Sequence, residues 1–189
     1  EGSSAISDAK GLYFINHDGA DKNKHMEIWT QGETEASSAW FPTIDSPNEK
    51  TTEEVYITVQ DKYTTLSNGL LIESTQNENG TRTDYWKMDQ PHSPYLFMMA
   101  VGEFAIVKDT WKKKDSSEIE VSYYVEKKFE PHARAIFGKT PKMIEHFSKL
   151  LGVEYPWSKY SQVVVRDYVS GAMENTSATI HGEFLYQTK

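Results

Sequence analysis

The sequence predicts a mainly β fold, an antiparallel β-sandwich or a set of curved sheets, followed by a segment with helices. Stretches of alternating polar and apolar residues recur roughly every 8 to 12 residues up to residue 125, with turn-forming residues between them. Tyr, Phe and Trp make up 13% of the chain, and aromatic residues favour strands. Beyond residue 125 the apolar residues recur with helical spacing instead. We therefore expect a β-rich domain over residues 1–127 and a second domain over residues 128–189.

Five segments of the first domain have the composition of strands. Residues 10–15 and 24–29 are short and aromatic, and a loop with turn-forming residues separates them. Residues 53–60 alternate cleanly, which predicts a half-buried strand. The apolar run at 95–104 predicts a buried strand or strand pair, and the alternating residues 118–125 predict the last strand of the β-rich region.

Two hairpins are expected in the middle of this domain. Asn68-Gly69 joins the strand-forming residues 64–67 and 70–74, and Asn-Gly is the strongest short-range signal for a hairpin. Residues 77–80 form a second turn of the same kind before a strand at 81–88.

Helices are expected at residues 131–137 and 143–151, where apolar residues fall on one face. That face carries Ile144, Phe147 and Leu151. Pro141 allows either a kinked helix or a new helix that Thr140 caps. Gly152 is a plausible stop for this helix, because glycine adopts the left-handed conformation common just beyond helix ends.

Composition excludes several classes of function. The formal net charge is -8, and acidic residues flank the basic run at 112–114, so we expect no nucleic-acid partner. The chain has no Cys, which excludes disulfides and thiolate zinc sites. No stretch reaches the ~18 apolar residues of a transmembrane helix. The first residues lack the features of a signal peptide, but a signal could precede them, so an exported and a cytoplasmic location both stay open.

The most informative stretch is Gly171-Ala172-Met173-Glu174-Asn175. It follows an apolar β-branched run at 163–165, which predicts a buried strand, and a polar turn at 166–170. A glycine that leads a short extended segment lets another backbone approach closely. Such an edge can hold an extended peptide by main-chain hydrogen bonds. Glu174 would then meet the free amino end of that peptide.

This G-A-M-E-N sequence resembles the exopeptidase motif of the zinc aminopeptidases of the alanyl aminopeptidase (aminopeptidase N) family, which are thermolysin-like metallopeptidases. Three further segments of the chain resemble a second signature of that family. They are T-Q-G-E at 30–33, W-F-P at 40–42 and D-S-P-N at 45–48. Taken without the resemblance, these segments predict only a polar loop and an aromatic-proline turn. The family's frequent C-F-D-E-P is Thr-Ile-Asp-Ser-Pro at 43–47 here, a departure that concerns packing.

Two more stretches resemble the same family. They are S-x-Y-L with a following G-x-F at 93–104, and G-x-x-Y-P-x-x-K-Y at 152–160. The resemblance thus covers residues 11–180. It implies a β-rich amino-terminal domain, incomplete at its start, followed by the first elements of a thermolysin-like α/β catalytic domain.

The resemblance also implies a set of substrate-binding residues. An aminopeptidase must recognise one free ammonium group, and two carboxylates in a partly desolvated cleft can each attract it. An internal peptide segment would leave those carboxylates unpaired, which is the source of specificity. The preferred substrate side chain is not implied. The substrate-binding residues that the resemblance implies are Glu174, Glu33, Gln31, Gly171, Ala172, Met173 and Asn175.

Hydrolysis in the family needs zinc held by an HExxH motif and a later Glu, with a Tyr that stabilises the transition state. The chain contains no HExxH, and its six His, at 17, 25, 92, 132, 146 and 181, include no i, i+4 pair. The resemblance places those elements further along. We therefore expect a fragment that by itself binds no catalytic zinc and hydrolyses nothing, with zinc present in the full-length protein. Its expected partners are a peptide with a free amino terminus and the remainder of the catalytic domain.

Two alternatives stay open. The β-rich domain could be a non-catalytic binding module that presents exposed aromatic rings, for which Tyr85, Trp86 and Trp111 are candidates. The chain could also belong to a degenerate family member that lost its metal site and serves as a scaffold or peptide binder. Oligomeric state is not indicated by either reading.

Overall fold

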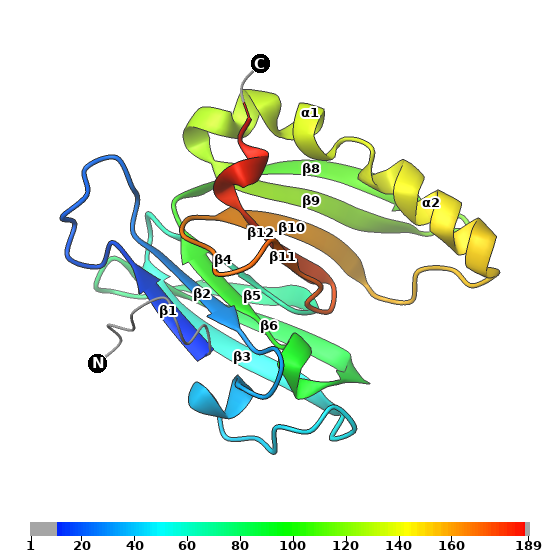
Figure 1. Ribbon diagram of the computed structural model, residues 1–189, viewed down its shortest axis with the longest axis horizontal. Helices are drawn as coiled ribbons and strands as arrows, with labels where there is room; N and C mark the ends of the chain where they lie inside the picture. Colours follow the sequence, from blue (N-terminus) through cyan, green and yellow to red (C-terminus); the bar gives the residue numbers. More distant parts are fainter. Residues whose placement is uncertain (1–10, 188–189) are drawn as a thin grey trace.

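The computed structural model describes residues 11–187, which form three sheets and two α-helices (Figure 1). The first sheet is antiparallel throughout and has the strand order β1-β2-β7-β4. Its strands are β1 (Gly11–Ile15), β2 (Glu27–Gln31), β7 (Met99–Gly102) and β4 (Thr64–Ser67). The mainly β, antiparallel character expected of the first domain is confirmed.

The second sheet is also antiparallel and has the order β3-β6-β5. Its strands are β3 (Thr51–Gln60), β6 (Thr81–His92) and β5 (Leu70–Gln76). Strand β3 shows the predicted alternation: Glu53 and Ile57 are buried, whereas Glu54, Tyr56 and Thr58 between and beside them are exposed.

The third sheet is mixed, with the order β11-β12-β10-β9-β8. Strand β10 runs parallel to both of its neighbours, and the two outer pairs are antiparallel. The strands are β8 (Phe104–Lys112), β9 (Glu118–Glu126), β10 (Lys159–Val165), β11 (Ala172–Met173) and β12 (Ala178–Gly182). Because β9 pairs with β10, a strand from beyond residue 127, this sheet extends across the expected domain boundary, and the boundary itself stays a prediction.

Helices α1 (Ala133–Phe137) and α2 (Thr140–Leu151) lie along one face of the third sheet (Figure 1). Four short 3₁₀ helices complete the described elements: η1 (Ser37–Ala39), η2 (Pro94–Leu96), η3 (Lys127–His132) and η4 (Glu183–Leu185). Across residues 11–187 no helix is long and apolar enough to cross a bilayer.

The apolar run at 163–165 does not alternate because both faces of β10 are covered. Val163 and Val165 belong to the core shared with the other sheets, which includes Trp29 and Leu66. Val164 points the other way, into the core beneath the helices. This central position makes β10 the strand on which the two cores meet.

The hairpin predicted at Asn68-Gly69 is wrong. Strands β4 and β5 flank this dipeptide but lie in different sheets, so the chain switches sheets there. Gly69 has a positive φ of 69°, and a Cβ at this position would lie 1.9 Å from the Lys87 carbonyl oxygen. The local conformation was readable from the sequence, but the partner of each strand was not.

Helix α2 matches the expected range, and Gly152 ends it with φ 72° as predicted. The predicted Thr140 cap is wrong, since the Thr140 hydroxyl instead donates to Gln162 Oε1 at 2.6 Å. Ile144 on the predicted apolar face is 9% exposed. Phe147 and Leu151 on that face are 55% and 71% exposed, so the helix packs by only part of its apolar stripe.

Candidate functional site

Two residues of the G-A-M-E-N sequence, Ala172 and Met173, form β11, the outermost strand of the third sheet as far as the structure describes it. Ala172 pairs with His181 and Met173 with Ile180, both on β12. The backbone of β11 thus bonds to a strand on one side, and the other side is a sheet edge. Met173 is buried, whereas Ala172 and Glu174 on either side of it are exposed, as the alternation of a strand requires.

The T-Q-G-E sequence lies where β2 ends. Thr30 and Gln31 are the last, buried residues of the strand, and Glu33 is exposed beyond it. Gly32 packs so tightly that a Cβ there would lie 2.5 Å from the carbonyl oxygen of Tyr95. A polar loop was the expectation from the residues alone, but half of this motif is strand.

The two motifs meet through the side chain of Gln31. Tyr168, in the turn before β11, donates a hydrogen bond from its hydroxyl to Gln31 Oε1 at 2.6 Å. Gln31 Nε2 lies 3.7 Å from the sulfur of Met173 on β11. These contacts fix which way the amide faces and join segments more than 130 residues apart in the sequence.

The pKa of the Tyr168 hydroxyl responds to charged residues of both motifs. Burial raises the pKa of its hydroxyl, and the negative charges of Glu174 and Glu33 raise the pKa further. Both exposed carboxylates of the two motifs therefore act on the same phenol. The ring of Tyr168 packs edge-on against Trp29 with centroids 5.0 Å apart, and the Trp29 indole donates to the Arg166 carbonyl at 3.0 Å.

Sequence reasoning missed Tyr168. It lies in the polar turn at 166–170, and a tyrosine in a turn carries no pattern that separates a site residue from a surface residue. Its one distinguishing feature in the sequence is its position three residues before Gly171.

The segment that contains S-x-Y-L supports both motifs. On the β2 side, Ser37 Oγ donates to the Pro94 carbonyl at 2.8 Å, and the Met99 amide donates to Thr30 Oγ1 at 3.0 Å. On the β11 side, the Thr176 amide donates to the Leu96 carbonyl at 3.3 Å. The third signature is thus the physical link between the other two.

Asn175 lies within this link and is buried. Its Nδ2 donates to the Phe97 carbonyl at 3.4 Å, and its Oδ1 has no hydrogen-bond partner among residues 11–187. Of the seven residues expected to bind substrate, four are exposed: Gly171, Ala172, Glu174 and Glu33. Gln31, Met173 and Asn175 are buried behind them.

The part of the chain that the structure describes contains no group of three or more His, Asp or Glu side chains arranged to hold a metal ion. His181, the half-buried histidine of β12, lies 3.3 Å from Gln162 Nε2. Burial lowers its pKa to about 4, so the ring is neutral near pH 7. The residues described do not fit a catalytic zinc site.

The sequence matches two models of one protein family. The Peptidase M1 N-terminal domain matches residues 5–96, and the Peptidase family M1 domain matches residues 136–187. The two matches lie one after the other along the chain, and both models describe parts of one peptidase family. The chain belongs to peptidase family M1.

Two similar proteins are named as aminopeptidases. The chain is 30% identical to human glutamyl aminopeptidase over 152 residues, which cover 79% of this chain and 15% of that protein. It is 26% identical to aminopeptidase N of Streptomyces lividans over 167 residues, which cover 86% of this chain and 19% of that protein. The chain therefore spans less than a fifth of the length of these relatives.

A solved structure has the same fold. The crystal structure of Legionella pneumophila aminopeptidase A in complex with aspartic acid superposes with a TM-score of 0.80 at 22% sequence identity. The match covers 92% of this chain and 20% of that one.

Proposed function

We propose that this chain supplies the substrate-anchoring part of a zinc aminopeptidase, an enzyme that removes amino-terminal residues from peptides. The observation that carries the proposal is the junction at Tyr168, where Gln31 of one motif and Met173 of the other are in contact. Glu33 and Glu174 lie exposed beside this junction and share its electrostatic field.

The two carboxylates would bind the free ammonium group of a peptide. At an effective dielectric of ~20, a carboxylate and an ammonium 4 Å apart attract each other by about 4 kcal/mol, and in bulk water by about 1 kcal/mol. Because Glu33 and Glu174 are exposed, the lower value applies until a bound peptide excludes water. Burying both carboxylates against an internal or acetylated segment would leave them without a cation, which disfavours such substrates.

The edge of β11 would hold the substrate backbone. A peptide that adds as a strand uses main-chain donors and acceptors, so it binds in an extended form that is largely independent of side chains. Gly171 offers close approach, since a Cβ there would meet no atom within 4 Å in this chain and the space is open to a ligand. Ala172 is small and exposed, which keeps the edge accessible.

Zinc, when bound in the rest of such an enzyme, would activate a water molecule and polarise the scissile carbonyl. Residues 11–187 provide no site that fits the ion, so their proposed part in the reaction is confined to binding and orienting. They would fix the amino end of the substrate and thereby set which peptide bond reaches the metal.

The experiment uses the protein that carries this chain. Aminoacyl p-nitroanilides should be hydrolysed and their N-acetylated forms should not. Glu174→Ala should lower kcat/KM by about 30-fold or more, as expected for removal of a charge partner, and by more than Glu33→Ala does. Glu78→Gln, in the exposed turn after β5, is the matched control and should leave kcat/KM unchanged.

Equal hydrolysis of free and acetylated substrates, or a neutral Glu174→Ala, would show that the anchor assignment is wrong. Binding of a free-amine peptide without any turnover would instead favour a non-catalytic peptide binder built on the same fold.

A further inference from the structure

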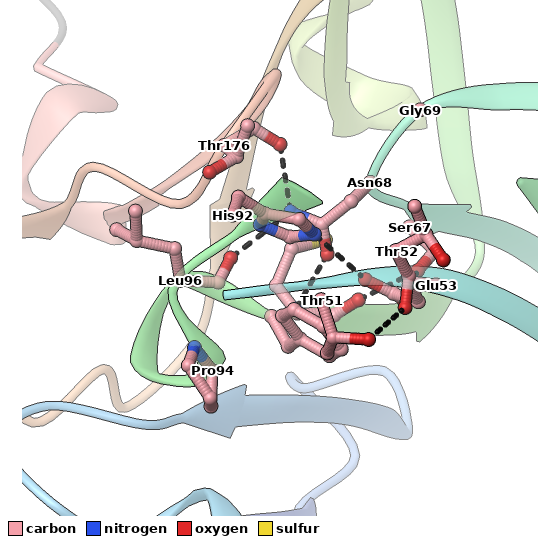
Figure 2. Close-up of polar contacts among 12 residues, drawn as sticks. Thr51, Thr52, Glu53, Ser67, Asn68, Gly69, His92, Pro94, Leu96 and Thr176 are labelled. Carbon is pink, nitrogen blue, oxygen red and sulfur yellow. Dashed lines mark hydrogen bonds and ion pairs between the residues drawn. The ribbon is translucent and has the colours of Figure 1, made fainter. Parts of the chain in front are cut away.

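Asn68 makes more connections across the molecule than a turn residue needs. Its side chain is 1% exposed at the point where the chain switches between β4 and β5. Its Nδ2 donates to the Thr176 carbonyl at 2.7 Å and to the Leu96 carbonyl at 2.9 Å, and its Oδ1 accepts from the Met98 amide at 2.7 Å. Figure 2 shows the amide between Leu96 and Thr176, with a dashed bond to each.

These three bonds use both N–H groups and the oxygen of the amide, so its orientation is fully determined. A buried amide with every group satisfied forms a rigid connection, and loss of one partner leaves a buried group unpaired. Asn68 therefore holds Thr176 and the segment Leu96–Met98 in one fixed relation.

Neighbouring contacts reinforce the same connection. The Gly69 amide donates to Ser177 Oγ at 2.9 Å, and the buried Lys159 ammonium donates to the Ser67 carbonyl at 2.9 Å and to the Ser177 carbonyl at 3.4 Å. Ser177 has φ 64°, a left-handed conformation that non-glycine residues adopt only where surrounding contacts enforce it. The chain just beyond Glu174 is thus held from the β4–β5 side.

A second Asn-Gly pair shows what an ordinary turn looks like. Asn79-Gly80 joins β5 and β6, which pair with each other, and both residues are exposed. Asn79 accepts a bond only from the nearby Thr81 hydroxyl among the contacts described, at 2.6 Å. The connections of Asn68 are therefore not a property of the dipeptide.

We propose that Asn68 is a positioning residue for Glu174. It ties Thr176, two residues beyond Glu174, to the Leu96–Met98 segment, and that segment continues into Met99, whose amide is bonded to Thr30 beside Gln31. One side chain thereby sets the position of the Glu174 carboxylate relative to the T-Q-G-E motif. This inference rests on the proposed function for its catalytic consequence, although the connection itself can be tested without activity.

The first test is amide hydrogen exchange in the 189-residue chain, followed by NMR. Asn68→Asp keeps the acceptor for Met98 but removes both N–H donors. The Thr176 amide donates to the Leu96 carbonyl, and Asn68 donates to the carbonyls of both Thr176 and Leu96. Without those two donors the segment should open more often, so the Thr176 amide should exchange about tenfold faster, a factor that corresponds to the net contribution of one ordinary hydrogen bond, while the Met98 amide should stay protected. Asn68→Ala should accelerate both amides. Asn79→Asp is the control and should change neither.

Ser177→Ala provides a milder variant in case Asn68→Asp does not fold. It removes the bond from Gly69 and should accelerate exchange of the Gly69 amide together with that of Thr176. A uniform acceleration that includes core amides such as those of Tyr123 and Val164 would indicate general destabilisation and would overturn the proposal. Unchanged exchange at Thr176 would also overturn it.

The second test is kinetic and uses the protein that carries this chain. Asn68→Asp should raise KM for aminoacyl anilides about tenfold with a smaller change in kcat, because a displaced anchor weakens binding of the ammonium. Faster exchange at Thr176 with unchanged KM would overturn the link between Asn68 and Glu174. If the proposed aminopeptidase activity itself is absent, the exchange result still decides whether Asn68 holds the segment.

Discussion

The hydroxyl of Tyr168 donates a 2.6 Å hydrogen bond to the side-chain oxygen of Gln31, across 137 residues of sequence. This bond joins the end of β2 to the turn that leads into β11. It lies among aromatic rings, since Trp29 packs against Tyr168 and stacks on Tyr13 with centroids 4.2 Å apart. Packing against these aromatic rings therefore holds Tyr168 and Gln31 in place.

Tyr168→Phe should test the value of this bond. The substitution keeps the ring against Trp29 and removes only the donor, which leaves the buried Oε1 of Gln31 without it. We expect the free energy of unfolding of the chain to fall by about 1 to 2 kcal/mol, measured by urea denaturation. Tyr85→Phe removes a surface hydroxyl that donates to Glu54 at 2.7 Å and should change stability by less than about 0.5 kcal/mol. Equal effects of the two substitutions would contradict this account.

Gly69→Ala and Gly80→Ala form a matched pair in the two Asn-Gly sequences. Both glycines have positive φ, 69° and 72°, so each alanine costs roughly 1 to 2 kcal/mol in backbone conformation. At Gly80 nothing lies within 4 Å of the added Cβ, whereas at Gly69 the Lys87 carbonyl oxygen would lie 1.9 Å away. Gly69→Ala should therefore cost about 3 kcal/mol or more in unfolding free energy, since backbone must move. Comparable costs measured by thermal unfolding would show that the sheet switch is not tightly packed.

The ranges of most elements could be predicted, because they depend on local periodicity. Strand β3 alternates, α2 has apolar residues three and four apart, and Gly152 stops that helix. The resemblance to a known family is confirmed, whereas its assignment of the substrate-binding site to two motifs stays a prediction.

The pairing of strands could not be predicted, because it depends on contacts far apart in the sequence. Asn68-Gly69 shows the limit: its conformation follows from the dipeptide, but the partner of each flanking strand depends on β6 and β7. Tyr168 and Asn68 were missed for the same reason, since their roles come from segments 137 and 108 residues away.

The two ends of the predicted apolar face of α2 should respond differently to truncation. Ile144 is 9% exposed and packs in the core beneath the helices, so Ile144→Ala should cost about 2 to 4 kcal/mol. Leu151 is 71% exposed, and Leu151→Ala should change stability by less than about 0.5 kcal/mol. Urea denaturation of the two variants measures both values. A large loss for Leu151→Ala in the isolated chain would mean that its side chain is covered in solution.

Glu27 should make the stability of the chain fall as pH rises. Burial raises the pKa of this carboxyl to about 8, against an ordinary value of 4.5, although the Arg166 amide donates to it at 2.8 Å. The neighbouring charges are Glu126 and Glu183, which oppose ionisation, and Arg166, which favours it. Between about pH 4.5 and 8 the folded state holds a proton that the unfolded state has lost, so the stabilising contribution is full below 4.5 and is lost as pH rises to 8.

Glu27→Gln replaces the neutral carboxyl with an uncharged group of the same shape that can still accept from the Arg166 amide. We expect the variant to match the parent chain at pH 4.5 and to be more stable than it at pH 8.5, by up to about 5 kcal/mol. Glu126→Gln should change the stability of the chain in the opposite direction. Burial would raise the pKa of Glu126, but the hydrogen bond from Arg166 and the ion pair with Lys128 outweigh it and hold the pKa below its ordinary value. That substitution should therefore destabilise the chain at neutral pH, and urea denaturation at several pH values distinguishes the two carboxyls. The slope from His181, whose pKa burial lowers to about 4, is common to both proteins, so the stability difference between Glu27→Gln and the parent isolates Glu27. A difference that does not grow between pH 4.5 and 8 would mean that Glu27 is ionised in the folded chain.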